Sequence, residues 1–177
     1  ETYDKDLRLI SGIPPWVQMF FEKIEKKTGK KTGETFPNFS LFVYGGVNYE
    51  PYRINFEKQI GRKVDTLETY PASEGFIAFQ DSRTEQGLLL ILNEGIFYEF
   101  IDAENSEEKN PKTIALHEVK TGINYELVIT TNGGLWRYRL GDTVEFTSAN
   151  PYRFRITGRT KQFINAFGEE LIVDNAN

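Results

Sequence analysis

The sequence predicts an α/β fold of mixed α+β type, in which an α/β portion is followed by a strand-rich, mostly antiparallel portion. Two observations lead to this prediction. Up to about residue 70, stretches with apolar residues at helical spacing alternate with short continuous apolar runs, as in α/β units. From Gly75 onward, short apolar segments follow one another and are separated by Gly, Asn and Asp turn signals, as in antiparallel sheets. The length of 177 residues fits one domain or a large piece of one.

Two helices are expected in the first portion. The first begins at Pro14-Pro15, where a missing N–H costs nothing, and its apolar residues recur at helical spacing until Thr28-Gly29. The second begins at Glu50-Pro51 and ends at Gly61. Lysines cluster at the end of the first helix, where cations suit the helix dipole, so a solvated helix end is favoured there over a phosphate site.

Short strands are expected where apolar runs are bounded by turn signals. They are Phe39–Tyr44, Val64–Thr69, Phe76–Phe79, Leu88–Leu92, Ile96–Ile101, Tyr125–Thr131, Trp136–Leu140, Thr143–Thr147 and Arg153–Thr157. Gly141-Asp142 is expected to form a turn between two of these strands, and the acidic segment 102–113 a mobile loop. His117 is most simply a strand residue that faces solvent.

Composition argues against several classes of function. A net charge of −5 disfavours a nucleic-acid-binding surface, which needs clustered positive charge. The chain has no Cys and one His, which excludes disulfides, a thiolate zinc site, a Cys nucleophile and a multi-His metal site within it. No apolar run approaches the ~18 residues that a membrane span needs. We therefore expect a soluble, cytoplasmic protein that has no membrane partner.

The first cluster of candidate functional residues, Glu68–Gly75, directly follows an expected strand. Open α/β sheets bind ligands at the carboxyl ends of their strands. There Tyr70 can stack on a flat ring, Ser73 can bind a phosphate oxygen and Glu74 can hold Mg²⁺. Taken alone, a turn rich in Pro, Ser and Gly remains the simpler interpretation.

The second cluster is Trp136–Asp142. Alternation along a strand places Arg137 and Arg139 on one face. Asp142 follows Gly141 at the expected strand end, where its carboxylate suits two vicinal hydroxyls such as those of a ribose. The alternative is a hairpin turn, because Gly-Asp is common there.

A third, weaker cluster is Gly158–Lys161, followed by Asn165 and Gly168. Its composition suits a phosphate-facing loop, a hinge or a simple turn. The sequence offers no Ser-His-Asp arrangement and no Gly-rich phosphate loop of the kind found in nucleotide-binding enzymes.

Taken together and in this order, the clusters resemble the Gretchen Hagen family of acyl-acid amido synthetases, which is similar to the larger adenylate-forming superfamily. The resemblance covers nearly the whole chain. It rests on Ser11–Trp16, Phe36–Asn38, Gly45–Val47, Glu50–Tyr52, the Tyr-x-x-Ser-Glu motif Tyr70–Glu74, Tyr125–Thr131 and the Tyr-Arg-x-Gly-Asp motif Tyr138–Asp142. Gly168–Leu171 resembles bacterial members of the family more than plant members.

The resemblance implies an enzyme that activates a carboxylic acid with ATP and Mg²⁺ as an acyl-adenylate. It would then transfer the acyl group to an amine such as an amino acid. The implied site residues are Tyr70 against the adenine, Ser73 on phosphate, Glu74 as a catalytic residue that holds Mg²⁺, Asp142 on the ribose hydroxyls, Arg159 on ribose or phosphate, and Gly45, Gly46 and Val47 as the floor between adenine and acyl pocket. Lys161 would be a catalytic residue near a hinge.

The same resemblance implies a part of a longer protein. Residues 1–157 would be the middle and end of the large adenylating domain, and residues 158–177 the hinge and the start of a C-terminal domain. The family's Ser/Thr/Gly-rich phosphate loop would then precede Glu1, so the fragment alone is expected to be inactive. Two alternatives stay open: a thioester-forming acyl-CoA ligase relative, and a non-catalytic fragment that binds a nucleotide or a partner.

Overall fold

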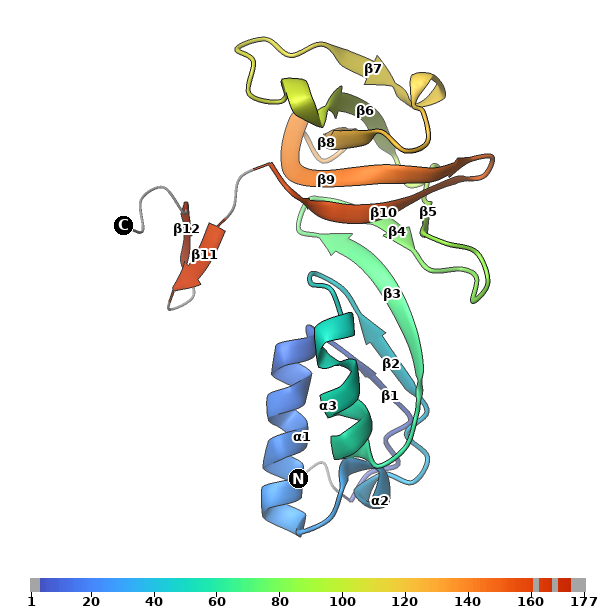
Figure 1. The fold of residues 1–177 in the computed structure, drawn as a ribbon, viewed down its shortest axis with the longest axis vertical. Helices are drawn as coiled ribbons and strands as arrows, with labels where there is room; N and C mark the ends of the chain where they lie inside the picture. The colour runs from blue at the N-terminus through green and yellow to red at the C-terminus, as the bar shows by residue number, and fades with distance from the viewer. Residues whose placement is uncertain (1–3, 161–162, 167–168, 173–177) are drawn as a thin grey trace. The chain divides into compact units, whose positions relative to one another are not determined.

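The computed structural model describes residues 4–160, 163–166 and 169–172. The chain divides into two compact units, Glu1–Gln80 and Asp81–Asn177, which are described separately below. Figure 1 shows helices confined to the first unit apart from short 3-10 turns, and strands in both. The predicted mixed α+β fold, with a strand-rich second portion, is therefore confirmed.

The first unit is a small sheet with helices packed on it. Its elements are β1 (Leu9–Ser11), α1 (Pro14–Thr28), α2 (Thr32–Thr35), β2 (Leu41–Tyr44), α3 (Glu50–Ile60), β3 (Asp65–Ala72) and β4 (Gly75–Phe79). The strand order is β1-β2-β3-β4, with β1, β2 and β3 parallel and β4 antiparallel to β3. Parallel strands need a crossover connection, and here α1 and α3 provide it.

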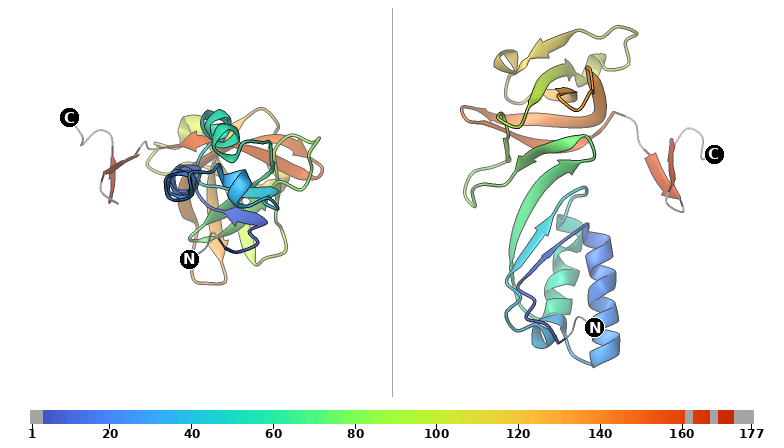
Figure 2. Two further views of the ribbon diagram at one scale, coloured as in Figure 1. Left: turned by 90° about the horizontal axis from the view of Figure 1, so that it is seen from below. Right: turned by 180° about the vertical axis from the view of Figure 1, so that it is seen from behind.

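The two long helices begin and end as the sequence predicts. Each has a Pro in its first turn, and each is followed by a Gly in the left-handed conformation, Gly29 with φ 68° and Gly61 with φ 86°. Figures 1 and 2 show α1 and α3 side by side against β1–β3. Between them lies an aromatic core in which the Phe56 ring is 5.2 Å from the Phe21 ring and 4.9 Å from the Phe42 ring.

The second unit is an antiparallel sheet. Its elements are β5 (Leu88–Leu90), β6 (Ile96–Asp102), η1 (Ala103–Asn105), β7 (Thr113–Ala115), η2 (Leu116–Glu118), β8 (Asn124–Thr131), β9 (Tyr138–Ala149) and β10 (Tyr152–Arg159). The strand order is β5-β10-β9-β8-β6-β7. Two further strands, β11 (Phe163–Ala166) and β12 (Glu169–Ile172), pair with each other in an antiparallel hairpin.

One face of this second sheet forms an apolar core. Phe146 on β9 lies at its centre, with ring centroids 5.2 Å from Phe100 and 5.8 Å from Phe154, both in edge-on contact. Leu127 and Ile129 of β8 are fully buried beside them. The apolar runs that predicted these strands thus lie in the buried part of the sheet, and in β8 five consecutive residues, Tyr125–Ile129, are buried.

Four expectations about local structure are wrong. Glu68–Gly75 is a hairpin, in which β3 runs to Ala72 and β4 starts at Gly75, rather than a loop after a strand. Gly141-Asp142 lies inside the continuous strand β9 and does not form a turn. Segment 102–113 is not a plain loop, because it contains η1 and reaches the start of β7. His117 is exposed, as expected, but it belongs to η2 and to no strand.

No helix in the described part of the chain is long and apolar enough to cross a membrane.

Candidate functional site

The first predicted cluster forms the tip of the β3–β4 hairpin. Tyr70 lies in β3 and is buried, with 4% of its surface exposed. Ser73 and Glu74 form the two-residue turn between the strands, where Ser73 is exposed and Glu74 half-buried. The hairpin thus presents the hydroxyl and the carboxylate at its tip while the aromatic ring is packed behind them.

Opposite the Tyr70–Pro71 step, the register of the hairpin is irregular. Tyr70 pairs with Ala78 and Pro71 with Phe76, so that β4 carries one additional residue, Ile77. Such a bulge accommodates a Pro, which has no N–H to donate to the ladder. This is why Pro71 does not end the strand, although the sequence suggested a loop here.

The predicted Gly-Gly segment lies against this strand. Gly45 follows β2 directly, and a Cβ atom on it would lie 2.5 Å from the Thr69 carbonyl oxygen and 2.9 Å from Pro71 Cδ. The Thr69 hydroxyl donates a 2.9 Å hydrogen bond to the Tyr44 carbonyl. The structure therefore brings Gly45 next to the strand that carries Tyr70, while Gly46 and Val47 are exposed beyond it.

A half-buried carboxyl that the sequence analysis left without a role lies at the same end of the strands. Glu68 of β3 is in register with Tyr44 of β2. Burial raises the pKa of Glu68, and a hydrogen bond with Tyr44 partly opposes this shift. The pKa of Tyr44 is also raised, first by burial and then by the charge of Glu68. The sequence motifs did not indicate the contact between Glu68 and Tyr44, because it depends on the register of β2 and β3.

The second predicted cluster contains a large bulge. On β8, Glu126 pairs with Thr143 and Val128 with Arg139, so the single residue Leu127 faces three residues of β9, Leu140–Asp142. Gly141 in this bulge has φ 77°, a left-handed conformation that favours Gly. The bulge thus takes Asp142 out of the regular alternation of the strand.

Asp142 and Arg159 are brought together by the other neighbour of β9. They are paired in register across β9 and β10, and Arg159 Nε donates a 2.8 Å hydrogen bond to Asp142 Oδ1. The amide of the next residue, Thr160, donates a 2.8 Å hydrogen bond to the Gly141 carbonyl. Asp142, which the resemblance placed on the ribose hydroxyls, and Arg159, which it placed on ribose or phosphate, therefore adjoin each other.

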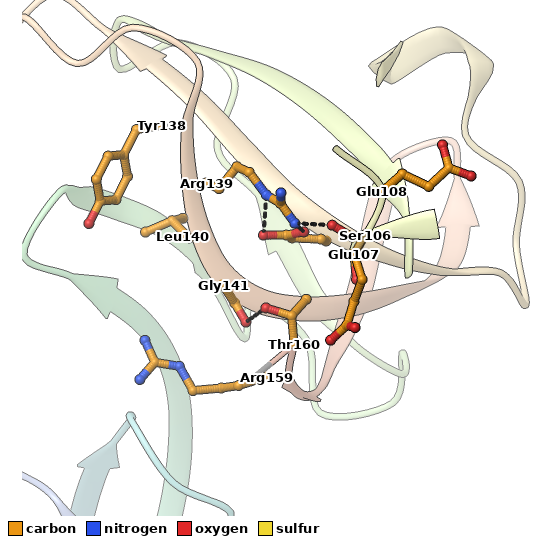
Figure 3. Close-up of a pocket in the computed structure, with 10 residues that line it drawn as sticks. Ser106, Glu107, Glu108, Tyr138, Arg139, Leu140, Gly141, Arg159 and Thr160 are labelled. Carbon is orange, nitrogen blue, oxygen red and sulfur yellow. Dashed lines mark hydrogen bonds and ion pairs between the residues drawn. The ribbon is translucent and has the colours of Figure 1, made fainter. Parts of the chain in front are cut away.

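An open pocket of about 650 Å³ lies beside this pair (Figure 3). It is lined by Ser106, Glu107, Glu108, Glu126, Tyr138, Arg139, Leu140, Gly141, Arg159 and Thr160. Its walls therefore combine carboxylates, two guanidinium groups and the edge of the Tyr138 ring. The sequence analysis did not anticipate the contribution of the segment after η1.

The two arginines of the second cluster each bind a carboxylate. The prediction that strand alternation places them on one face is wrong, because β9 begins at Tyr138, after Arg137. Arg137 precedes β9 in a left-handed conformation, φ 47°, and its Nε donates to Glu99 at 3.0 Å. Arg139 Nε donates to Glu126 Oε1 at 2.8 Å and Nη2 binds Oε2. The hydrogen bond to Glu126 raises the pKa of Arg139.

Metal-binding capacity is limited. No group of three or more His, Asp or Glu side chains in the described part of the chain could hold an ion. Mg²⁺ is commonly bound by one or two carboxylates together with substrate phosphates, so a single residue such as Glu74 is compatible with it. Lys161 and Gly168 lie outside the described residues, as does the side chain of Asn165.

Comparison with known sequences yields one family. Residues 89–159 match the family model described as GH3 family central domain. The chain is 35% identical over 118 residues to a jasmonoyl–L-amino acid synthetase, JAR4, of Nicotiana attenuata, covering 63% of this chain and 20% of that protein. It is 33% identical over 144 residues to jasmonoyl–L-amino acid synthetase GH3.5 of Oryza sativa subsp. japonica, covering 72% and 24%. The chain therefore spans about a quarter or less of these relatives.

Comparison with solved structures agrees on the fold. The GH3.15 acyl acid amido synthetase matches with a TM-score of 0.59 and 21% identity, over 78% of this chain and 25% of that one. A 2-hydroxyisobutyryl-CoA ligase in complex with an acyl-AMP matches with a TM-score of 0.61 and 16% identity, over 93% and 35%. Both likenesses are evidence of the fold alone. The fold of this chain is therefore similar to part of each of these two enzymes.

Proposed function

The chain belongs to the GH3 family, and we propose that it is part of an ATP-dependent acyl-acid amido synthetase, a ligase that forms carbon–nitrogen bonds. The parent protein would activate a carboxylic acid as an acyl-adenylate and transfer the acyl group to an amine such as an amino acid. The observation that carries this proposal is the pairing of β9 with β10, which places Asp142 of the β9 bulge beside Arg159 within the segment that matches the family's central domain.

The described residues suit a nucleotide. A carboxylate beside a guanidinium offers both an acceptor for ribose hydroxyls and a donor for ribose or phosphate oxygens. The exposed Ser73 hydroxyl and the half-buried Glu74 carboxylate lie at one hairpin tip, as contacts to a phosphate and its Mg²⁺ require. We assign Tyr70 to the adenine, and Gly45, Gly46 and Val47 to the floor between adenine and acyl pocket.

The chemistry explains why no His or Cys is needed. A carboxylate is already an anion, so its attack on the α-phosphorus requires no general base. Charge builds up on the phosphoryl oxygens, and bound Mg²⁺ and cationic donors stabilise it. In this chain Glu74 would hold the ion, and Asp142 and Arg159 would fix the position of the nucleotide relative to the acyl group.

We further propose the domain roles and the location. Residues 1–157 would belong to the large adenylating domain and residues 158–177 to the hinge and the beginning of the C-terminal domain, with Lys161 near the hinge. A small carboxylic acid and an amino acid would be the substrates, and the cysteine-free composition suits a cytoplasmic enzyme.

The test is carboxylate-dependent exchange of pyrophosphate into ATP by the complete protein that contains this chain. It would be screened over carboxylic acids with Mg²⁺, and product formation with amino acids or with coenzyme A would be followed by mass spectrometry. Amide products with amino acids are expected. Thioester products would favour the acyl-CoA ligase alternative, and the absence of exchange with every acid would favour a binding module. The isolated 177-residue chain is expected to show no exchange.

A further inference from the structure

The bulge of β9 is bracketed by the ion pair of Arg139 and Glu126. Arg139 is the last regularly paired residue before the bulge, and Thr143 is the first after it. Glu126 of β8 is in register with Thr143 of β9, and its side chain binds Arg139 at the opposite end of the bulge. The Arg139–Glu126 pair therefore spans the three bulged residues.

The geometry of this pair is tightly defined. Both guanidinium nitrogens Nε and Nη2 bind the two carboxylate oxygens of Glu126, the planar two-point contact that fixes direction as well as distance. Arg139 Nη2 also donates to the Ser106 carbonyl at 2.6 Å, as Figure 3 shows. Ser106 is itself buried. Arg139 is thus held by β8 and by the segment after η1 at once.

Burial makes the pair different from a surface ion pair. The Glu126 side chain is 2% exposed, whereas the Arg139 side chain is 40% exposed and reaches the pocket wall. A buried carboxylate is retained only when it is paired, and removing its partner is strongly destabilising. A buried carboxylate bound at two points by a partly exposed guanidinium is suited to fixing the geometry between β8 and β9.

We propose that Arg139 and Glu126 are positioning residues that hold the β9 bulge in the shape that presents Asp142 to the ribose of the nucleotide. This inference rests on the proposed function, in which Asp142 binds the ribose hydroxyls. Arg139 lies three residues before Asp142 on the same strand. Because its guanidinium binds both Glu126 and the Ser106 carbonyl, the bulge has little freedom to change shape. Neither residue needs to touch the nucleotide.

The test compares the binding of ATP with that of 2′-deoxy-ATP and 3′-deoxy-ATP by the complete protein, using titration calorimetry. A ratio of affinities is used because a general loss of stability or affinity cancels in it, whereas a displaced Asp142 does not. The wild type is expected to prefer ATP by about tenfold per hydroxyl bound by the carboxylate. Asp142→Ala, the benchmark, is expected to reduce the preference to about onefold.

Three variants probe the pair. Arg139→Met removes the guanidinium, and Glu126→Gln keeps one acceptor oxygen but loses the charge. The double variant Glu126→Leu/Arg139→Met fills the same space with apolar side chains, so that it folds even if the single Arg139 change does not. We expect each folded variant to lose most of the preference for ATP over the deoxynucleotides.

Arg155→Met is the matched control. Arg155 of β10 binds Glu145 of β9 with two hydrogen bonds of 3.0 and 2.9 Å, on the other side of β9 from Glu126, and this pair does not span the bulge. The control is expected to keep the wild-type preference.

The inference is overturned if folded variants of the Arg139–Glu126 pair keep the wild-type preference while Asp142→Ala loses it. A wild type that binds no nucleotide would overturn the proposed function as well, and a wild type whose preference survives Asp142→Ala would overturn the role of Asp142 itself.

Discussion

Gly45 provides a sharp test of the packing behind the proposed nucleotide floor. An Ala Cβ there would lie 2.5 Å from the Thr69 carbonyl oxygen, about 0.9 Å short of the 3.4 Å at which ordinary contact begins. It would also lie 2.9 Å from Pro71 Cδ. Neither atom belongs to a flexible side-chain end, so Gly45→Ala has to push β3 away from the end of β2.

The cost of this displacement has two parts. Overpacking of this kind typically costs about 1–3 kcal/mol. Moving Thr69 away from Tyr44 also weakens the 2.9 Å hydrogen bond that joins them, which contributes about 1 kcal/mol. We therefore expect Gly45→Ala to lower the free energy of unfolding of the first unit by about 2–4 kcal/mol.

Amide hydrogen exchange in the complete protein measures this effect locally. Faster exchange is expected in residues 41–44 and 65–72, because opening of these strands becomes easier. Gly46→Ala is the matched control: Gly46 has φ 81° but its nearest neighbour would be Ile13 Cγ1 at 3.9 Å, so its cost is conformational only, about 1–2 kcal/mol. Wild-type exchange rates in Gly45→Ala, or equal effects of the two substitutions, would refute the steric argument.

Three further outcomes follow from the contacts of single side chains. Arg62→Met removes guanidinium hydrogen bonds of 2.9, 3.4, 2.8 and 2.6 Å to four backbone carbonyls between residues 33 and 39, and is expected to lower the free energy of unfolding by about 2–3 kcal/mol in urea titrations. Burial raises the pKa of Glu68 above its ordinary 4.5, so folding favours the protonated form of this carboxyl. The stability that Glu68 contributes is therefore fully present below pH 4.5 and is lost as the pH rises through the raised pKa. Glu68→Gln should remove this slope, and an unchanged pH dependence of urea unfolding would contradict the assignment. The Tyr98 hydroxyl is buried and has no hydrogen-bond partner among the described residues. Tyr98→Phe should therefore leave the free energy of unfolding unchanged or raise it by up to about 1 kcal/mol, which thermal unfolding would measure; a lowered thermal midpoint would contradict this.

Sequence reasoning succeeded where local chemistry decides the structure. The bounds of α1 and α3 follow from Pro in the first turn and Gly after the last, and both signals act within a few residues of chain. The longer strands follow from apolar runs of the right length. The sequence did not reveal β1 and β7, which have three residues each and no apolar run bounded by turn signals, whereas β5, equally short, lies in the apolar run Leu88–Leu92.

Sequence reasoning failed where a Gly or Pro lies at a β-bulge and does not end the strand. Gly141 has the left-handed conformation that a turn requires, and only the pairing of β9 with β8 and β10 determines that the strand continues. The partners of Arg139 and Glu68 were hidden for a related reason. Each depends on the register of two strands, and register is set by contacts distant in sequence.

Both candidate motifs lie where the strand register is interrupted. The first interruption places an additional residue on β4, opposite the Tyr70–Pro71 step, and the second places three residues of β9 opposite one of β8. In β3 the irregular step follows Tyr70, and in β9 the bulge contains Asp142. An interruption frees a side chain from strict alternation, but it also gives up ladder hydrogen bonds and so loosens the strand. In each unit a side-chain contact offsets this loss: the Thr69 hydroxyl binds the end of β2, and Arg139 binds Glu126 across the bulge. A residue that must meet a ligand at a fixed angle needs both parts, the bulge to point it and the contact to hold it. Residues outside the two motifs, here Thr69 and Glu126, are therefore as decisive for the proposed site as the motif residues themselves.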